Sequence, residues 1–261
     1  MKIIDGKKIA DEIGIGLVKR GSPVKFLAAV IAGNNPASLK FVERKKKFAD
    51  AIGAELKVFR VDTSISADDL VTTVKYLAND PECGGLMIQL PLPPEVDKEA
   101  VISLIPKDKD ADALNKESGV VSPAALTVKE ILERENLDIS SLVVAVIGLG
   151  SLVGKPVSEW IGSKCKELVV IDKGDALVPA NGADVLVLGT GERGIIRARD
   201  LKDKAVVIDF GCSFDEEGKI CGDLDLKEAE DKDISYTPTP GGTGPILIAK
   251  LFENFYQLNN Q

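Results

Sequence analysis

The chain has 261 residues, of which 44% are hydrophobic, and its formal net charge is −8. This length fits one large domain or two smaller ones, and the acidic balance argues against general nucleic-acid binding. The chain has no histidine, which excludes Ser-His and Cys-His nucleophile pairs and imidazole metal sites. A general base must therefore be Asp, Glu, Lys, Tyr or Cys.

Neither a membrane segment nor a disulfide framework is expected. The charged start of the chain lacks the apolar stretch of a signal peptide, and no apolar run reaches the ~18 residues that span a bilayer. The cysteines are scattered without a CxxC pair, as suits a reducing compartment, at Cys83, Cys165, Cys212 and Cys221. We expect a cytoplasmic protein with no membrane partner and no bound metal.

The first half of the chain alternates strand-like and helix-like segments, which predicts a parallel sheet with helices on its faces. Gly53 is the expected C-cap of the first of these helices, and Ser66 is a possible N-cap of the second. The predicted strands cover 26–32, 55–61 and 85–90, and the predicted helices cover 38–52 and 67–78.

The predicted helix 38–52 carries Ser38, Phe41 and Lys45 on one face, at i, i+3 and i+7. An aromatic ring beside an amine could hold a flat substrate and transfer its proton. The same spacing also suits an amphipathic helix without any chemistry. Gln89 is a single polar residue at the end of an apolar strand, where open α/β folds bind ligands; it could equally cap the backbone before the prolines that follow.

The acidic run 108–112 opens like a calcium loop but does not continue as one. Ala113 stands where glycine is required, and Gly119 stands where a carboxylate is required. A carboxylate that recognises an amide or amidine edge of a substrate remains possible here, and so does a solvated acidic turn.

The second half predicts a dinucleotide-binding fold. A helix is expected at 127–135, strands at 142–147, 168–171, 185–188 and 205–209, and a helix at about 152–163. Gly148, Gly150 and Gly154 follow the first of these strands and open the helix, which suits phosphates at a helix N-terminus. Glycines can also serve close strand–helix packing alone.

Two neighbouring residues leave the choice between NAD and NADP open. Asp172 ends the next strand, ~20 residues after the glycines, where a carboxylate binds a ribose 2′-hydroxyl and favours NAD. Lys173 could instead meet the 2′-phosphate of NADP. An exposed pair of charges without a ligand is the third possibility.

The stretch 237–245 contains three prolines and three glycines directly before an apolar helix expected at 246–257. Such a rigid loop without bulky side chains lets backbone approach a ligand closely. A Pro/Gly linker is the alternative, although linkers are usually also rich in Ser, Glu or Lys.

Stretches in the same order along nearly the whole chain resemble the bifunctional methylenetetrahydrofolate dehydrogenase/methenyltetrahydrofolate cyclohydrolase family. The resemblance implies a homodimer of a folate enzyme that oxidises 5,10-methylenetetrahydrofolate with NAD(P)⁺ and hydrates the product to 10-formyltetrahydrofolate. The stretches that carry it are 4–7, 36–47, 89–93, 108–112, 148–156, 222–223 and 238–245.

The resemblance also implies an architecture of two α/β domains with a cleft between them. Residues 1–120, joined by the C-terminal helix 246–261, would form the substrate domain, and 121–245 a Rossmann-type NAD(P)-binding domain. Lys45 would be the catalytic lysine, modulated by Gln89, with Asp112 on the pterin edge. The other implied site residues are Ser38, Phe41, Pro240, Gly241 and Gly242 for folate, and Gly148, Leu149, Gly150, Ser151, Val153, Asp172, Lys173, Thr190 and Cys212 for NADP or NAD.

The chain departs from the family's usual residues in a few places. Phe41 replaces a tyrosine, which keeps a ring for stacking but removes a hydroxyl. Leu149 and Gly150 replace an Arg-Ser pair, so a pair of phosphate donors is lost. These departures leave room for an enzyme with only one of the two activities. A shikimate-type dehydrogenase and a non-catalytic nucleotide-sensing regulator are the alternative functions.

Overall fold

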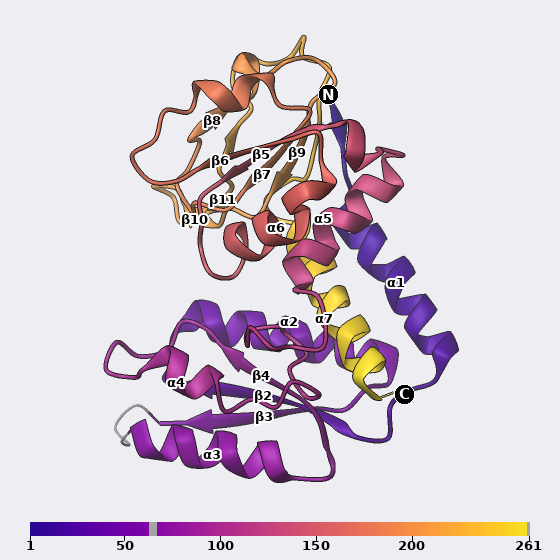
Figure 1. Cartoon of the computed structure of the whole chain (residues 1–261), viewed down its shortest axis with the longest axis vertical. Coiled ribbons are helices and arrows are strands. Elements are labelled where there is room, and N and C mark those ends of the chain that lie inside the picture. Colours follow the sequence, from indigo (N-terminus) through magenta and orange to yellow (C-terminus); the bar gives the residue numbers. More distant parts are fainter. Residues whose placement is uncertain (63–66, 260–261) are drawn as a thin grey trace. The chain divides into compact units, whose positions relative to one another are not determined.

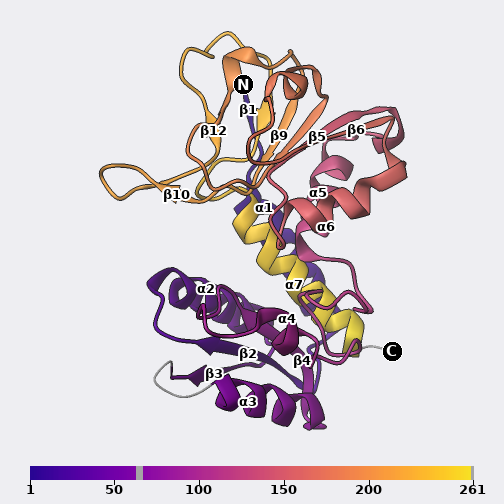
Figure 2. The same cartoon turned by 60° about the vertical axis from the view of Figure 1, so that its left-hand side comes forward.

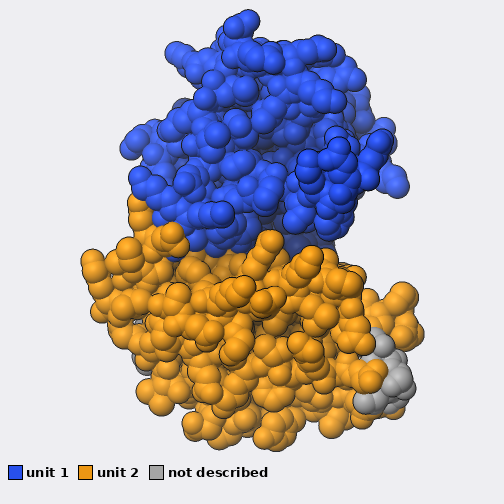
Figure 3. All heavy atoms as spheres, turned by 180° about the vertical axis from the view of Figure 1, so that it is seen from behind, with its two compact units in different colours: residues 1–10, 124–247 blue, residues 11–123, 248–261 orange. Residues whose placement is uncertain are grey.

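The computed structural model describes residues 1–62 and 67–259, and their contacts form two compact units (Figure 1, Figure 3). Unit 1 comprises Met1–Ala10 and Ala124–Leu247, and unit 2 comprises Asp11–Pro123 and Ile248–Gln261. The sequence placed residues 1–10 with the other unit. The difference arises because the short strand β1 (Lys2–Ile3) pairs with β13 (Ser235–Tyr236) in the sheet of unit 1.

Unit 2 is built on a three-stranded parallel sheet in the order β3-β2-β4. Figure 1 shows α2 and α3 on opposite faces of this sheet. One face of the sheet packs on Leu70, Val74 and Leu77 of α3, which recur along one side of that helix. The elements are β2 (Phe26–Ala32), α2 (Pro36–Ile52), β3 (Leu56–Val61), α3 (Ala67–Asn79), β4 (Cys83–Gln89) and α4 (Lys98–Ile102).

Local capping explains where α2 begins and ends. The Asn35 side chain accepts hydrogen bonds from the backbone amides of Ala37 and Ser38 at 3.0 and 3.1 Å. Pro36 occupies the first position of the helix. Gly53 closes the helix with φ 73°, as the sequence predicted. The possible N-cap of α3, Ser66, lies outside the described residues.

The final helix α7 (Thr243–Asn259) contributes its residues from Ile248 onward to unit 2. Phe252 stacks at a tilt on Phe48 of α2, with ring centroids 5.5 Å apart. The Tyr256 hydroxyl donates to the carbonyl of Ile52 at 3.4 Å. The last helix therefore completes the core of unit 2 beside α2.

Unit 1 holds a six-stranded parallel sheet in the order β1-β13-β9-β7-β5-β6. The chain runs from β5 to the edge strand β6 on one side and then to β7 on the other, so the strand order reverses at β5. Open α/β sheets bind ligands at the carboxyl ends of the strands beside such a reversal. The main strands are β5 (Val143–Ile147), β6 (Glu167–Ile171), β7 (Val185–Leu188) and β9 (Val206–Asp209).

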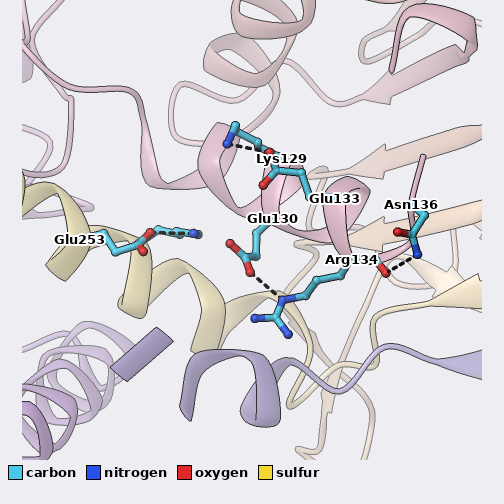
Figure 4. A network of polar contacts seen from close by, with 7 residues as sticks. Lys129, Glu130, Glu133, Arg134, Asn136 and Glu253 are labelled. Carbon is cyan, nitrogen blue, oxygen red and sulfur yellow. Dashed lines mark hydrogen bonds and ion pairs between the residues drawn. The ribbon is translucent and has the colours of Figure 1, made fainter. Parts of the chain in front are cut away.

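Helices α5 (Pro123–Arg134) and α6 (Gly154–Ile161) belong to this unit. Ion pairs one turn apart join Lys129 to Glu133 at 2.9 Å and Arg134 to Glu130 at 2.6 Å along α5 (Figure 4). The first pair is exposed and the second is partly buried, and pairs at this spacing stabilise a helix modestly. Short 3₁₀ helices lie at Ile139–Ser141, Gly162–Lys164, Val178–Gly182 and Ala198–Asp200.

Smaller strands complete unit 1. A hairpin of β10 (Ser213–Phe214) and β11 (Ile220–Cys221) extends away from the main sheet (Figure 2). Strands β8 (Ile196–Arg197) and β12 (Leu224–Asp225) pair in parallel. The sequence analysis missed these pieces because strands of two residues carry no hydrophobic period.

The sequence analysis also missed the helix α1 (Gly6–Arg20). Its signals were present. Asp5 caps it by accepting from the amides of Lys7 and Lys8, at 3.0 and 3.1 Å. Ile9, Ile13 and Leu17 form the buried stripe at i, i+4 and i+8. Among the described helices, none has the length and apolar character needed to cross a membrane.

Candidate active site

Lys45 is the most unusual residue of unit 2 because its amine is buried. The residue is 2% exposed to solvent and lies on the buried face of α2 with Ser38, Val42 and Ala49. Lysine is almost never fully buried without a paired charge or a function. The burial of Lys45 therefore marks this face of α2 as a candidate site.

The Lys45 amine lies among a small set of contacts. Its Nζ atom donates to Gln89 Oε1 at 3.2 Å and lies 3.3 Å from Met87 Sδ, both on β4. The amine also stands 5.1 Å from the centre of the Phe41 ring. The structure thus brings Gln89 to Phe41 and Lys45, which the sequence had placed on one helical face apart from Gln89.

Gln89 is held in a single orientation. Its Nε2 atom donates to the carbonyl of Leu90 at 2.8 Å, which turns Oε1 toward Lys45. The amide therefore bonds at once to the backbone, as the capping interpretation from the sequence predicted, and to the lysine.

Asp112 provides the opposite charge. Burial lowers the pKa of Lys45 below its ordinary value, while the nearby charge of Asp112 partly raises it. Burial likewise raises the pKa of Asp112, and Lys45 counteracts this. The amine can therefore lose its proton at a lower pH than an exposed lysine, with a carboxylate close enough to modulate the loss.

The turn that carries Asp112 is fixed by its neighbour Asp110, which is fully buried. The Asp110 carboxylate accepts from the amides of Leu114 at 3.1 Å and Asn115 at 2.8 Å. Burial raises the pKa of Asp110 to about 6. Ala113 adopts φ 52° in this turn, a left-handed conformation that residues with a Cβ rarely take.

Ser38 lies two turns before Lys45 on the same face of α2. It is 5% exposed, and its Oγ donates to the carbonyl of Leu90 at 3.5 Å. Ser38, Phe41, Lys45, Gln89 and Asp112 all belong to unit 2, so this half of the predicted site is brought together within one compact body.

The loop with Pro240, Gly241 and Gly242 belongs to unit 1 and leads into α7. The peptide bond between Thr239 and Pro240 is cis, and Gly241 has φ 105°. A Cβ on Gly242 would collide with the backbone of Pro238 and with Thr237. The loop is a tightly packed turn with an exposed Pro240, which differs from an extended linker.

The glycine loop follows β5 at the point where the strand order reverses. Gly148 has φ 88°, and a Cβ on Gly154 would collide with the Gly148 carbonyl. Leu149, Gly150 and Ser151 are exposed in the loop, and Val153 is half-buried just before α6. An exposed glycine turn at this position of a parallel sheet, followed by a helix N-terminus, suits a dinucleotide.

Asp172 and Lys173 are both exposed just after β6. Asp172 Oδ1 accepts from the Leu149 amide at 3.2 Å, which links the end of β6 to the glycine loop. The Asp172 amide donates to Asp175 Oδ2 at 2.9 Å. Asp172 thus has a structural contact, and its exposed carboxylate also faces the solvent beside the loop.

Thr190 and Cys212 follow β7 and β9 at the same edge of the sheet. Thr190 is half-buried and Cys212 is exposed. The segments that contain Thr190 and Cys212 are hydrogen-bonded to the buried carboxylates of Asp223 and Asp209, to which the sequence gave no role. The bonded residues are far apart in the sequence, which hid these contacts. A carboxylate at the end of an apolar strand, as in Asp209, was the signal that could have revealed them.

Comparisons with known proteins cover almost the whole chain. A family model described as "Tetrahydrofolate dehydrogenase/cyclohydrolase, catalytic domain" matches residues 4–112, and one described as "Tetrahydrofolate dehydrogenase/cyclohydrolase, NAD(P)-binding domain" matches residues 122–261. The bifunctional protein FolD of Bacillus velezensis is 34% identical over 97% of this chain and 95% of its own length.

Solved structures agree with these matches. The bifunctional enzyme FolD, methylenetetrahydrofolate dehydrogenase/cyclohydrolase, from Campylobacter jejuni aligns with a TM-score of 0.93 and 27% identity over 100% of this chain and 99% of its own. The Trypanosoma brucei FolD, solved with NADP cofactor and an inhibitor, aligns with a TM-score of 0.91 and 27% identity over 99% and 97%.

Proposed function

The chain belongs to the tetrahydrofolate dehydrogenase/cyclohydrolase family, and from this we propose a two-step folate reaction. In the first step, a hydride leaves the methylene carbon of 5,10-methylenetetrahydrofolate, which yields the 5,10-methenyl cation. In the second step, water adds to that carbon with loss of a proton, and ring opening yields 10-formyltetrahydrofolate. The observation that carries the proposal is the buried Lys45 amine bonded to Gln89 beside Phe41.

The dehydrogenase step needs alignment more than acid–base chemistry, because adjacent nitrogens already stabilise the developing cation. Bound NADP⁺ would supply the hydride acceptor. In unit 1 the exposed glycine loop and the segments with Thr190 and Cys212 would hold the cofactor. In unit 2 the Phe41 ring offers a flat apolar face for a pterin.

The hydration step needs a base for the attacking water. Without histidine in the chain, Lys45 fits this role because burial lowers the pKa of its amine. Gln89 would keep the amine in place, since its own amide is fixed by the Leu90 carbonyl. Asp112 would bind the pterin edge and adjust the proton affinity of Lys45 by its charge.

The chain has an NAD(P)-binding domain, and we take NADP as its cofactor, with NAD as the alternative. The relative from Trypanosoma brucei was solved with NADP. Lys173 could meet the 2′-phosphate of NADP, whereas Asp172 beside it would accept a ribose hydroxyl. Which nucleotide the chain prefers depends on the balance of these two side chains.

We propose that residues 1–120 with the C-terminal helix bind folate, that 121–245 bind the nucleotide, and that the enzyme acts as a cytoplasmic homodimer. The projecting hairpin supports a dimer, because Phe214 on it is 61% exposed and an exposed aromatic residue suits a protein contact. Sedimentation velocity would test the dimer.

One assay tests the reaction. The purified chain is mixed with 5,10-methylenetetrahydrofolate and either NADP⁺ or NAD⁺, and the absorbance of the reduced nucleotide and of the methenyl product is followed. Separately, hydrolysis of added methenyltetrahydrofolate is followed without nucleotide. We expect both activities. Nucleotide reduction with shikimate instead of folate would favour the shikimate-type alternative, and no turnover of any kind would favour a nucleotide-sensing regulator.

A further inference from the structure

Two carboxylates in unit 1 are buried without a positive partner among the ion pairs of the described residues. Asp209 is the last residue of β9 and is 2% exposed, and Asp223 stands just before β12 and is fully buried. Burying an ionised carboxylate without a cation costs several kcal/mol, so such groups usually serve a purpose.

Asp223 binds the segment that follows β7. Its Oδ2 atom accepts from the Thr190 amide at 2.7 Å, the Thr190 hydroxyl at 2.8 Å and the Gly191 amide at 3.2 Å. Three donors on a single oxygen fix both the backbone and the side chain of Thr190. Any ligand contact of Thr190 therefore depends on Asp223.

Asp209 is hydrogen-bonded to the segments that follow β9, that begin β12 and that flank the loop with Pro240. Its carboxylate accepts from the Gly211 amide at 2.7 Å and the Leu224 amide at 3.0 Å. Its backbone amide donates to the Thr237 hydroxyl at 2.8 Å, and its carbonyl accepts from the Thr243 hydroxyl at 2.8 Å. Asp209 thus fixes the start of the segment with Cys212 and both ends of the loop that contains Pro240.

The two carboxylates interlock through glycines. A Cβ on Gly211, which donates to Asp209, would collide with Asp223 Oδ1. A Cβ on Gly222, the neighbour of Asp223, would collide with Asp209 Oδ2. The Asp223 carboxylate therefore packs against the glycine that is bonded to Asp209, and the Asp209 carboxylate packs against the glycine next to Asp223. The positions of the two carboxylates are coupled through these contacts.

One oxygen of the pair lacks a donor. Asp223 Oδ1 has no hydrogen-bond partner among the described residues, although it is buried. Burial, with a smaller contribution from the charge of Asp223, raises the pKa of Asp209 to about 6, against the amide hydrogen bonds that lower it. The neighbours that face Asp209 are otherwise backbone amides and threonine hydroxyls, and Asp223 is the other charged group that acts on it.

We propose that Asp209 and Asp223 are positioning residues of the cofactor site: the hydrogen bonds of the two carboxylates together fix the segments with Thr190 and Cys212. Below about pH 6 the protonated form of Asp209 prevails beside Asp223. Above that pH two buried like charges repel each other, the segments loosen, and the nucleotide binds more weakly. The inference rests on the proposed function in that Thr190 and Cys212 are taken to contact the cofactor.

The experiment compares nucleotide binding by the full chain and its variants. The dissociation constant for NADP is measured by calorimetry at several pH values between about 5 and about 7.5, a range that brackets the expected transition. The variants are Asp223→Asn, Asp223→Ala and the control Asp231→Ala, whose side chain is exposed in the same unit. Because phosphate monoesters titrate near pH 6, the quantity compared is the ratio between each variant and the parent at the same pH.

Asp223→Asn can keep the Thr190 contacts with its carbonyl oxygen and place its amide nitrogen where the partnerless oxygen lies. We expect it to bind NADP about as well as the parent near pH 5 and relatively better as the pH rises. Asp223→Ala is expected to weaken binding by roughly tenfold or more, since it removes three hydrogen bonds, and to raise the KM for NADP more than the KM for folate. Asp231→Ala should bind as the parent does.

A constant ratio between Asp223→Asn and the parent across the pH range overturns the inference, even if Asp223→Ala does not fold. Unchanged NADP binding by a folded Asp223→Ala also overturns it. If the parent turns over folate and binds NADP, either result leaves the proposed function intact. If the parent binds neither NADP nor NAD, the proposed function and the inference fail together.

Discussion

Replacement of Lys45 by methionine is expected to stop hydration of the methenyl cation and to stabilise the fold. Lys45 is 2% exposed, and its amine donates to Gln89 Oε1 and to the weak acceptor Met87 Sδ and lies near the Phe41 ring. Incompletely bonded buried polar groups cost ~1–3 kcal/mol. Removal of the amine avoids this cost, but Gln89 loses its donor in the variant, which offsets part of the stabilisation. The free energy of unfolding should therefore rise by about 1 kcal/mol.

The same change removes the proton acceptor of the hydration step. General acid–base catalysis contributes roughly 10²–10⁴-fold, and the hydrolysis rate should fall by that factor. Binding of NADP, which the proposal assigns to unit 1, should persist. Hydrolysis is followed by the loss of methenyl absorbance, and stability by urea unfolding.

The matched control is Lys46→Met on the same helix, because the Lys46 side chain is 54% exposed. The control should alter neither quantity strongly, since its amine is already in water. Unchanged hydrolysis by Lys45→Met would remove the lysine from the mechanism. A loss of hydrolysis accompanied by a large loss of stability would show that the amine is structural instead.

Three further predictions concern other parts of the chain. Asp172→Ser removes a negative charge next to the expected ribose site, so the ratio of kcat/KM for NADP to that for NAD should rise several-fold; an unchanged ratio rejects a role of Asp172 in cofactor choice. Ala113→Gly should raise the free energy of unfolding by up to about 1 kcal/mol, because it relieves the left-handed φ of 52°; chemical denaturation measures this, and a decrease would refute the strain. Burial raises the pKa of Asp110 from 3.8 to about 6, so its protonated form is favoured in the folded chain. The stability from this group is full below about pH 4 and is lost as the pH rises through about 6, an effect of about 3 kcal/mol. Asp110→Asn should therefore lose less stability than the parent between these pH values, and equal losses would contradict the assignment.

The sequence predicted the elements whose pattern is continuous. The apolar run of β2 at Phe26–Ala32 and the strand β7 at Val185–Leu188 were predicted residue for residue, because a buried parallel strand has apolar residues on both faces. The two α/β domains and the family also followed from the sequence. Short strands such as β10 did not, since a two-residue strand produces no period. The helix α1 did not either, although Ile9, Ile13 and Leu17 recur at helical spacing, because Gly14 and Gly16 lower the helix propensity of this segment.

The candidate site divides in the same way. The sequence placed Ser38, Phe41 and Lys45 on one helical face, but it could not distinguish a catalytic helix from an amphipathic one. What distinguishes them is the burial of the Lys45 amine against Gln89, a contact between residues far apart in the chain. The Asp209–Asp223 pair was hidden for the same reason, since Asp209 ends β9, Asp223 lies in the loop before β12, and only the fold brings them together.

The account depends most on the proton affinity of the Lys45 amine. Selective isotope labelling of lysine, with Lys45→Met to assign its signal, allows the titration to be followed by nuclear magnetic resonance in the full chain. A pKa clearly below the ordinary ~10.4 is the predicted result. A pKa at or above that value would leave the enzyme without a base for hydration and contradict the proposed mechanism.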